Sequence, residues 1–185
     1  MSYIVRCLCA SLLSLICAVN VYAGQSPDGY SGGQWWINTG LGAGSGSGLG
    51  GGAALLEGNY RLSEHQLISV RATKTSDFQI FSPSNEFTEV GALYGVIAKA
   101  KYGYASASAG LGWAQYKDYV TYHNFFSGGG NETTRRQNTV NIPLEIQLFT
   151  TPTPYVGIGL IGFSNINSVN VVSGAFLALQ FGNLW

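Results

Sequence analysis

Three residues of one segment have the side chains that ester hydrolysis requires. The stretch DYVTYHNFFSGGGNETTRR, residues 118–136, contains His123, Ser127 and Glu132, which could serve as base, nucleophile and orienting acid. Such catalysis needs the base within hydrogen-bond reach of the nucleophile. Ser127 lies four residues after His123 in a glycine-rich stretch that offers no rigid positioning. The sequence therefore favours a loop without catalytic activity, and hydrolysis is the lesser alternative.

The glycines of a second stretch have the spacing of a dinucleotide-binding loop. Gly46, Gly48 and Gly51 fit G-x-G-x-x-G, a motif that needs a following helix whose N-terminus meets the phosphate. No helical periodicity follows Gly51. The stretch is therefore predicted to be a flexible connection, and no cofactor is expected.

Metal-ligating side chains are sparse. The two histidines, His65 and His123, are far apart, and the three cysteines all lie within the first 17 residues. Those residues have a signal-peptide pattern, with one positive charge followed by the uncharged apolar run CLCASLLSLICAV. We expect residues 1–23 to be removed after Ala23, which leaves residues 24–185 as one exported domain without a thiol. No metal site is predicted.

Strands are the elements that would position the charged side chains. The sequence predicts eight of them, over residues 34–43, 52–62, 66–75, 87–98, 103–117, 137–149, 155–164 and 172–185. Their connections alternate between long and short. This alternation is typical of an up-and-down barrel in the outer membrane, with short turns on the periplasmic side and longer loops outside. The predicted fold is all-β, an eight-stranded antiparallel transmembrane barrel.

A soluble, lipocalin-like barrel has the same periodicity. The number of charged residues available for the outer surface therefore decides between the two kinds of barrel. Nine Lys and Arg and nine Asp and Glu make up 10% of the chain, against about 25% in soluble domains. The stretch YGYASASAGLGWA has no charge on either face, although a soluble barrel needs charge outside on every strand. The apolar faces should therefore point to lipid. The balanced charge, without runs of Lys and Arg, argues against nucleic acid as a partner.

Side chains of the opposite parity would point into the barrel. Five of them are charged: Glu57, Arg61, Arg71, Glu89 and Glu145. The interior of eight strands is just wide enough for side chains to fill. Charges of both signs in that space would pair and plug it rather than line a wide pore. We therefore expect a set of ion pairs in the lumen.

Aromatic residues fall near the predicted strand ends, which predicts two girdles at the membrane interfaces. One set would lie at the periplasmic ends: Trp35, Tyr60, Phe149, Tyr155, Phe181 and Trp185. The other set would lie at the outer ends: Phe78, Phe87, Trp113, Tyr116 and Phe163. Pro143 falls inside the sixth predicted strand, and because it has no N–H we expect a β-bulge there.

The C-terminal segment AFLALQFGNLW alternates, with Leu177, Leu179, Phe181 and Trp185 on one face. In a closed barrel such a strand would pair with the first strand, which satisfies its backbone groups to the end. With the signal peptide and the eight strands, this segment resembles the small outer-membrane barrels of the OmpA/OmpX-like class. The resemblance implies a location in the bacterial outer membrane and recognition of these four residues by the barrel-assembly machinery.

These observations predict a monomeric outer-membrane barrel without catalytic activity, which acts in surface interaction or envelope integrity through mobile extracellular loops. Arg135 and Arg136, at the outer end of the sixth strand, are expected to contact lipopolysaccharide, since arginine pairs well with phosphate. A narrow, porin-like channel is one alternative. A lipid-modifying enzyme is another. Lipid A deacylases among such barrels use Ser, His and Glu with the histidine two residues before the serine, where this chain has Phe125.

Overall fold

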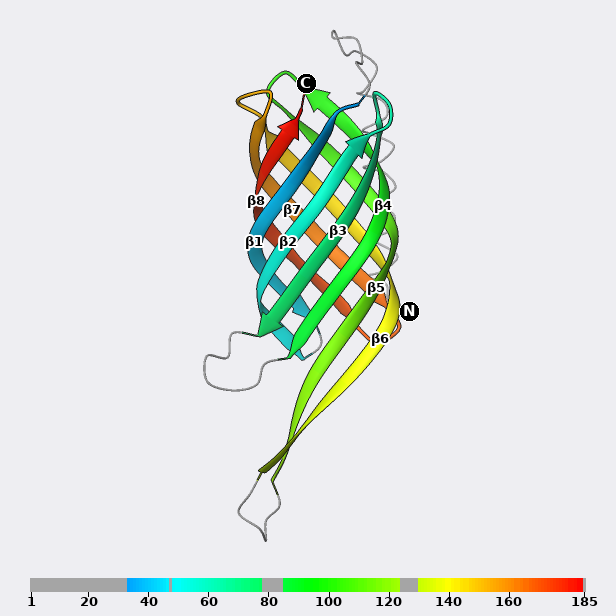
Figure 1. Cartoon of the computed structure of the whole chain (residues 1–185), viewed down its shortest axis with the longest axis vertical. Helices are drawn as coiled ribbons and strands as arrows, with labels where there is room; N and C mark the ends of the chain where they lie inside the picture. Colours follow the sequence, from blue (N-terminus) through cyan, green and yellow to red (C-terminus); the bar gives the residue numbers. More distant parts are fainter. Residues whose placement is uncertain (1–32, 47, 78–84, 124–129, 185) are drawn as a thin grey trace, which may run out of the picture.

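The computed structural model describes residues 33–46, 48–77, 85–123 and 130–184. They form eight antiparallel strands that close into one barrel in chain order (Figure 1). The strands are β1 (Trp35–Gly46), β2 (Leu49–Arg61), β3 (Gln66–Asp77), β4 (Glu86–Ala100), β5 (Gly103–His123), β6 (Gly130–Thr150), β7 (Val156–Asn167) and β8 (Val171–Asn183). The predicted eight-stranded up-and-down barrel is confirmed. The predicted signal peptide, residues 1–23, lies outside the described residues.

The strands bury every second side chain, as a period of two requires. In β2 the alternation runs along the whole strand. The inward side chains fill the lumen with aromatic, aliphatic and polar groups. The outward side chains are largely apolar; Leu41, Leu111 and Leu177 are among the most exposed. The barrel therefore has an apolar outer wall and a mixed, tightly filled interior. The described residues include no helix with the length and hydropathy to cross a membrane.

The two rims of the barrel differ in their connections. The turns that join β2 to β3, β4 to β5 and β6 to β7 are short, and they lie at the rim where β8 ends (Figure 1). We call this the short-turn rim and the opposite one the long-loop rim. The predicted alternation of long and short connections is only partly correct, because the connections from β1 to β2 and from β7 to β8, at the long-loop rim, are also short.

β5 and β6 extend further than predicted at the long-loop rim. The sequence suggested a loop between residues 117 and 137, whereas the β5–β6 ladder continues to the pair His123↔Gly130. Tyr, Val and Thr fill residues 119–122, and these residue types favour strands. β4 pairs with β5 only as far as Lys117, and β7 pairs with β6 only as far as Asn141. The hairpin therefore projects beyond the barrel with both edges open (Figure 1).

The prediction of a β-bulge at Pro143 is wrong. Ala109 pairs with Leu144 and Gly112 with Asn141, so two residues of β5 face two residues of β6 and the register is unchanged. The ladder between β6 and β7 also runs through Pro143 without a shift. The missing N–H instead interrupts the β5–β6 ladder over those two residue pairs, and the proline itself is buried.

β8 closes the barrel against β1, from the pair Trp35↔Asn183 to the pair Ser45↔Ser173. Gly182 permits the close approach at this seam, since its φ of +154° is unfavourable for other residues. A Cβ at Gly182 would collide with the Trp35 carbonyl oxygen and would lie 2.8 Å from the Cβ of Trp36. The expected pairing of the last strand with the first is confirmed.

The prediction of two aromatic girdles is only partly correct. Exposed aromatic rings do lie on the wall near the short-turn rim: Trp35, Tyr60, Tyr155 and Phe181. Four of the predicted girdle residues are instead buried in the lumen: Phe149, Phe87, Tyr116 and Phe163. Trp113 is exposed as expected, and Phe78 and Trp185 lie outside the described residues. Parity along the strand decides where a ring points, and nearness to a strand end does not.

Candidate functional site

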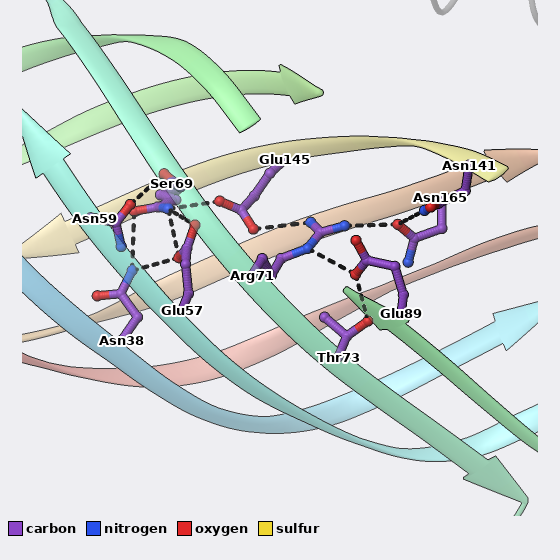
Figure 2. Close-up of polar contacts among 11 residues, drawn as sticks. Asn38, Glu57, Asn59, Ser69, Arg71, Thr73, Glu89, Asn141, Glu145 and Asn165 are labelled. Atoms are coloured by element: carbon purple, nitrogen blue, oxygen red, sulfur yellow. Dashed lines mark hydrogen bonds and ion pairs between the residues drawn. The ribbon is translucent and has the colours of Figure 1, made fainter. Parts of the chain in front are cut away.

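Arg71 is the centre of a buried polar network inside the barrel. Its guanidinium donates from Nε to Glu89 Oε2 at 3.3 Å, from Nη1 to Glu145 Oε2 at 3.0 Å and from Nη2 to Asn165 Oδ1 at 2.7 Å. The side chains of Arg71, Glu89 and Glu145 are inaccessible to solvent. Figure 2 shows these groups converging from β3, β4, β6 and β7. One guanidinium therefore connects four strands.

Gln147 connects Glu57 to this network. Its Nε2 atom lies 2.7 Å from Glu145 Oε1 and 3.0 Å from Glu57 Oε2. Asn38 Nδ2 also donates to Glu57 Oε2, at 2.9 Å. The Tyr104 hydroxyl donates to Gln147 Oε1 at 2.9 Å. A continuous chain of polar contacts thus runs from β1 and β2 through β6 to Arg71.

The network contains more carboxyl groups than cations. Glu57, Glu89 and Glu145 are all buried around the single guanidinium of Arg71. Arg71 forms ion pairs with Glu89 and Glu145, while Glu57 has no Lys or Arg within ion-pair distance among the described residues. Burial of a charge is costly unless an opposite charge and hydrogen bonds compensate for it. The middle of the lumen therefore has an excess of acidic groups.

Arg61 lies apart from the other four charged residues expected in the lumen. It is buried at the short-turn rim, where Nη1 donates to Gln34 Oε1 at 2.7 Å. Its Nε donates to the Ser63 carbonyl at 3.1 Å and its Nη2 to the Glu64 carbonyl at 2.5 Å. Arg61 therefore holds the turn between β2 and β3, whereas Glu57, Arg71, Glu89 and Glu145 share one network.

Aromatic side chains pack in the lumen on both sides of the network. The inner aromatic cluster, towards the short-turn rim, consists of Trp36, Tyr104 and Phe149. The outer aromatic cluster, towards the long-loop rim, consists of Phe87, Tyr116, Phe163 and Phe176. Neighbouring rings lie between 4.7 and 5.6 Å apart, centroid to centroid. The polar network is therefore enclosed between two apolar layers.

Neutral polar residues complete the network, and the sequence analysis gave them no role. They are Asn38, Thr73, Asn141, Gln147 and Asn165. Each lies on the inward parity of its strand, as the charged residues do. This shared parity allows their inward orientation to be predicted from the sequence. Which of these residues meet across the lumen follows only from the register of the closed barrel.

A second polar group lies on the outer face of the long-loop rim. Glu86 is 3.1 Å from the Lys74 Nζ and 3.3 Å from the Lys117 Nζ. Lys117 faces Arg136 across the β5–β6 ladder, and Arg136 is exposed. We call Lys74, Glu86, Lys117 and Arg136 the basic rim. The basic rim, with three cations and one carboxylate, has a net positive charge. Arg135 is exposed beside it, opposite Asp118 in the same ladder.

The residues considered for hydrolysis lie at and beyond the end of the β5–β6 ladder. His123 is the last residue of β5 and faces Gly130 in the ladder, and Glu132 faces Thr121. Ser127 lies outside the described residues. No group of three His, Cys, Asp or Glu side chains that could hold a metal ion occurs in the ranges that the structure describes.

The proposed assembly residues of β8 point outward. Leu177, Leu179 and Phe181 are exposed on the wall, with exposed fractions of 61%, 45% and 47%. Trp185 lies outside the described residues. The same apolar surface continues around the barrel through Ile37, Val70, Val90 and Leu160, among others. A continuous apolar wall of this kind suits lipid rather than water.

The barrel has the fold of known outer-membrane proteins. It is similar to neisserial surface protein A, with a TM-score of 0.62, 14% identity and coverage of 84% of this chain and 99% of that one. Ail of Yersinia pestis gives a TM-score of 0.58 at 13% identity, over 82% and 99% of the two chains. OprG of Pseudomonas aeruginosa gives 0.57 at 8% identity, over 83% and 97%. No protein-family model and no curated protein matches the sequence.

The fold and the apolar outer wall both indicate a membrane environment. Each of these three structures is a bacterial outer-membrane barrel, and each is covered almost completely by the present chain. The apolar wall described above is the surface that such an environment requires. The protein is a small eight-stranded β-barrel of the bacterial outer membrane.

Proposed function

We propose that this protein is a non-catalytic surface barrel that presents the β5–β6 hairpin outside the cell for contact with anionic partners, lipopolysaccharide first among them. The observation that carries this proposal is the projection of the hairpin. Residues 118–123 of β5 and 130–135 of β6 pair only with each other. Short turns face the periplasm in outer-membrane barrels, so the hairpin at the opposite rim is extracellular.

The charge of the basic rim supports an anionic partner. Lys74 and Lys117 flank the carboxylate of Glu86 on the outward face of the wall, and Arg136 faces Lys117 across the β5–β6 ladder. This is the level at which the phosphates of lipopolysaccharide meet an outer-membrane barrel. Arg136 and its neighbour Arg135 are both exposed, and arginine forms bidentate bonds with phosphate. We therefore assign lipopolysaccharide contact to Arg135 and Arg136 together with the two lysines.

The filled lumen supports a scaffold rather than a pore. Arg71, Glu89 and Glu145 are fully buried between the inner and outer aromatic clusters. Interiors of eight-stranded barrels hold side chains rather than an open channel. The lumen would then serve to fix the wall, and the surface would serve for binding. Ail has also been solved with the heparin analogue sucrose octasulfate, a polyanion of the charge class that the basic rim would suit.

Export and assembly complete the proposal. Residues 1–23 would direct the chain across the inner membrane, and the outward face of β8, with Leu177, Leu179, Phe181 and Trp185, would be read by the assembly machinery. The assembled protein would act as a monomer, because the closed β1–β8 seam leaves no strand edge within the wall for a second copy.

Reconstituted vesicles test the proposed partner. Arg135→Gln with Arg136→Gln should weaken the association of the barrel with lipopolysaccharide, and the loss should shrink as salt concentration rises. Lys101→Gln is the matched control, because Lys101 is an exposed cation in a short turn at the opposite rim. Equal binding by the double variant and the control would refute the assignment.

Two further measurements separate this proposal from its rivals. Planar bilayers with the unmodified protein should show little conductance, whereas steady large conductance would indicate a channel. Incubation with lipid A or phospholipid should leave the lipids unchanged, and release of an acyl chain would indicate an enzyme. Either contrary result would replace the proposed function.

A further inference from the structure

A hollow in the outer wall lies across β2, β3, β4 and β5. Its volume is about 520 Å³, within the range of about 300–1,000 Å³ that ligand sites usually have. Its lining includes the small outward residues Gly58 and Ala92, and a Cβ at Gly58 would meet no atom within 4 Å. Ala92 pairs with Val70 on one side and with Leu111 on the other, and both of these larger side chains are more than half exposed. We call this feature the wall hollow.

A row of neutral polar residues crosses the same wall between the basic rim and the wall hollow. Thr88, Gln115 and Asn138 face one another in the β4–β5 and β5–β6 ladders, and Gln115 Nε2 donates to Asn138 Oδ1 at 3.0 Å. We call these three residues the polar row. Hydroxyl and amide side chains both donate and accept hydrogen bonds, so the polar row can bind the hydroxyl and amide groups of a sugar.

The wall becomes apolar beyond the polar row, towards the short-turn rim. The next row contains Val90, Trp113 and Val140, which are all more than half exposed. The wall hollow begins one row further, at Leu111. At about 3.3 Å per residue, Leu111 lies roughly 20 Å along β5 from Lys117 of the basic rim. Over that length the surface changes from cationic through polar to apolar.

From this order of surfaces we propose that the wall over β2 to β6 binds one lipopolysaccharide molecule through its lipid A part. Phosphate groups would contact the basic rim, and the sugar units would lie on the polar row. An acyl chain would run past Trp113 into the wall hollow. This inference rests on the proposed contact with lipopolysaccharide and adds the acyl chain as a second determinant of affinity.

The sequence of surfaces selects lipid A over other occupants. The net positive charge of the basic rim favours an anionic headgroup, and a soluble anion would leave Trp113 and the wall hollow uncovered. A second copy bound by the same face in a two-fold dimer would bring one basic rim close to the other, and their like charges would repel. Lipid A carries phosphates, sugars and acyl chains in the order in which the wall presents their partners.

Filling the wall hollow tests the acyl-chain contact. Barrels are reconstituted into phospholipid vesicles with dilute labelled lipopolysaccharide, and the dissociation constant is measured by titration. Ala92→Phe should weaken this association about three- to tenfold, because its ring takes the place of the chain and removes the chain's dispersion contacts with the hollow. Ala175→Phe is the matched control, since Ala175 is an exposed alanine of β8, on the opposite side of the barrel, and this variant should bind like the unmodified protein.

A variant that removes atoms gives an independent test. Leu111→Ala takes away one side of the wall hollow without adding bulk, so it should also weaken the association with lipopolysaccharide. Its exposed position makes it a mild change for folding, and it keeps the inference testable where Ala92→Phe fails to fold. Heat-modifiable migration on gels confirms that each variant is folded before binding is measured.

A probe without acyl chains separates this inference from the proposed function. Inositol hexakisphosphate is a soluble polyphosphate, so Ala92→Phe and Leu111→Ala should bind it like the unmodified protein, whereas Arg135→Gln with Arg136→Gln should weaken both probes. Lipopolysaccharide binding that falls in the arginine variant but equals the Ala175→Phe control in Ala92→Phe and Leu111→Ala would overturn the acyl-chain contact alone. Weaker binding of the soluble probe by Ala92→Phe would also overturn it, because the change would then act through the basic rim. Unchanged binding of both probes by the arginine variant would instead refute the proposed function.

Discussion

Arg71 lies directly opposite Glu57 in the β2–β3 ladder, yet its guanidinium forms ion pairs with Glu89 and Glu145 instead. Opposite residues on one face of two strands are the usual partners. Here the longest interaction of Arg71 along the sequence reaches Asn165, 94 residues away. The bonds to Glu145 and Asn165 therefore connect strands that meet across the lumen only when the barrel closes.

Removal of the Arg71 side chain should destabilise the barrel and loosen its plug. Arg71→Ala leaves Glu89 and Glu145 buried without their cation, and breaking a buried pair costs about 3–5 kcal/mol. We expect a lower free energy of unfolding in urea, followed by tryptophan fluorescence, and higher conductance in planar bilayers as water enters. Arg135→Ala, at an exposed position, should change neither quantity. If Arg71→Ala equals the unmodified protein in both stability and conductance, the interpretation of the network as a plug is wrong.

The three carboxyl groups should differ in what their neutralisation costs. Glu145→Gln removes an ion-pair partner of Arg71 and should lower the free energy of unfolding by about 3 kcal/mol. Glu57→Gln removes a charge that has no cation beside it and keeps an amide that can still bond, so its effect should stay within about 1 kcal/mol. Urea unfolding of both variants in one detergent makes the comparison. The reverse order would show that Glu57 carries the compensated charge.

Gly182 should be essential at the seam between β1 and β8. Gly182→Ala places a methyl group against the Trp35 carbonyl oxygen and the Trp36 side chain, at a φ that other residues rarely adopt. A strained backbone of this kind costs about 1–3 kcal/mol, so the yield of heat-modifiable, folded barrel should fall. Gly58→Ala is the matched control, because a Cβ there would meet no atom within 4 Å. Equal yields of folded barrel from Gly182→Ala and Gly58→Ala would show that the seam does not require Gly182.

Deletion of the last five residues tests how the end of β8 acts. Loss of residues 181–185 removes the pairs that Phe181 and Asn183 make with β1 and the exposed Phe181 ring. The shortened protein should lose its heat-modifiable migration on gels, because the seam then begins several residues further from the short-turn rim. Outer-membrane fractions should contain little of it. A truncated barrel that reaches the membrane in normal yield would contradict both the seam and the assembly role.

The fold was accessible from the sequence because the signal is local. Alternation with a period of two gives the strands and tells which residues point inward, so Glu57, Arg71, Glu89 and Glu145 were identified by parity alone. The same rule also tells where the aromatic side chains point. Nearness to a strand end predicts a girdle position for Phe87 and Phe163, but their parity along the strand places them in the lumen.

The contacts inside the lumen were not accessible because they depend on register across the whole barrel. Nothing near Gln147 in the sequence reveals that its amide lies between Glu57 and Glu145. The pairing of Gly91 with Gly112 is equally hidden, since it depends on the register between β4 and β5. For Pro143 the local rule predicts a β-bulge, whereas the β5–β6 ladder is interrupted over two residue pairs and keeps its register.

In the proposed orientation, the length of the β5–β6 hairpin sets how far the protein reaches from the cell. Residues 118–123 continue past the last β4 pairing, and at about 3.3 Å per residue they extend roughly 20 Å beyond the barrel. Surface sugar chains shorter than this distance would leave the end of the ladder accessible to a partner, and longer chains would cover it.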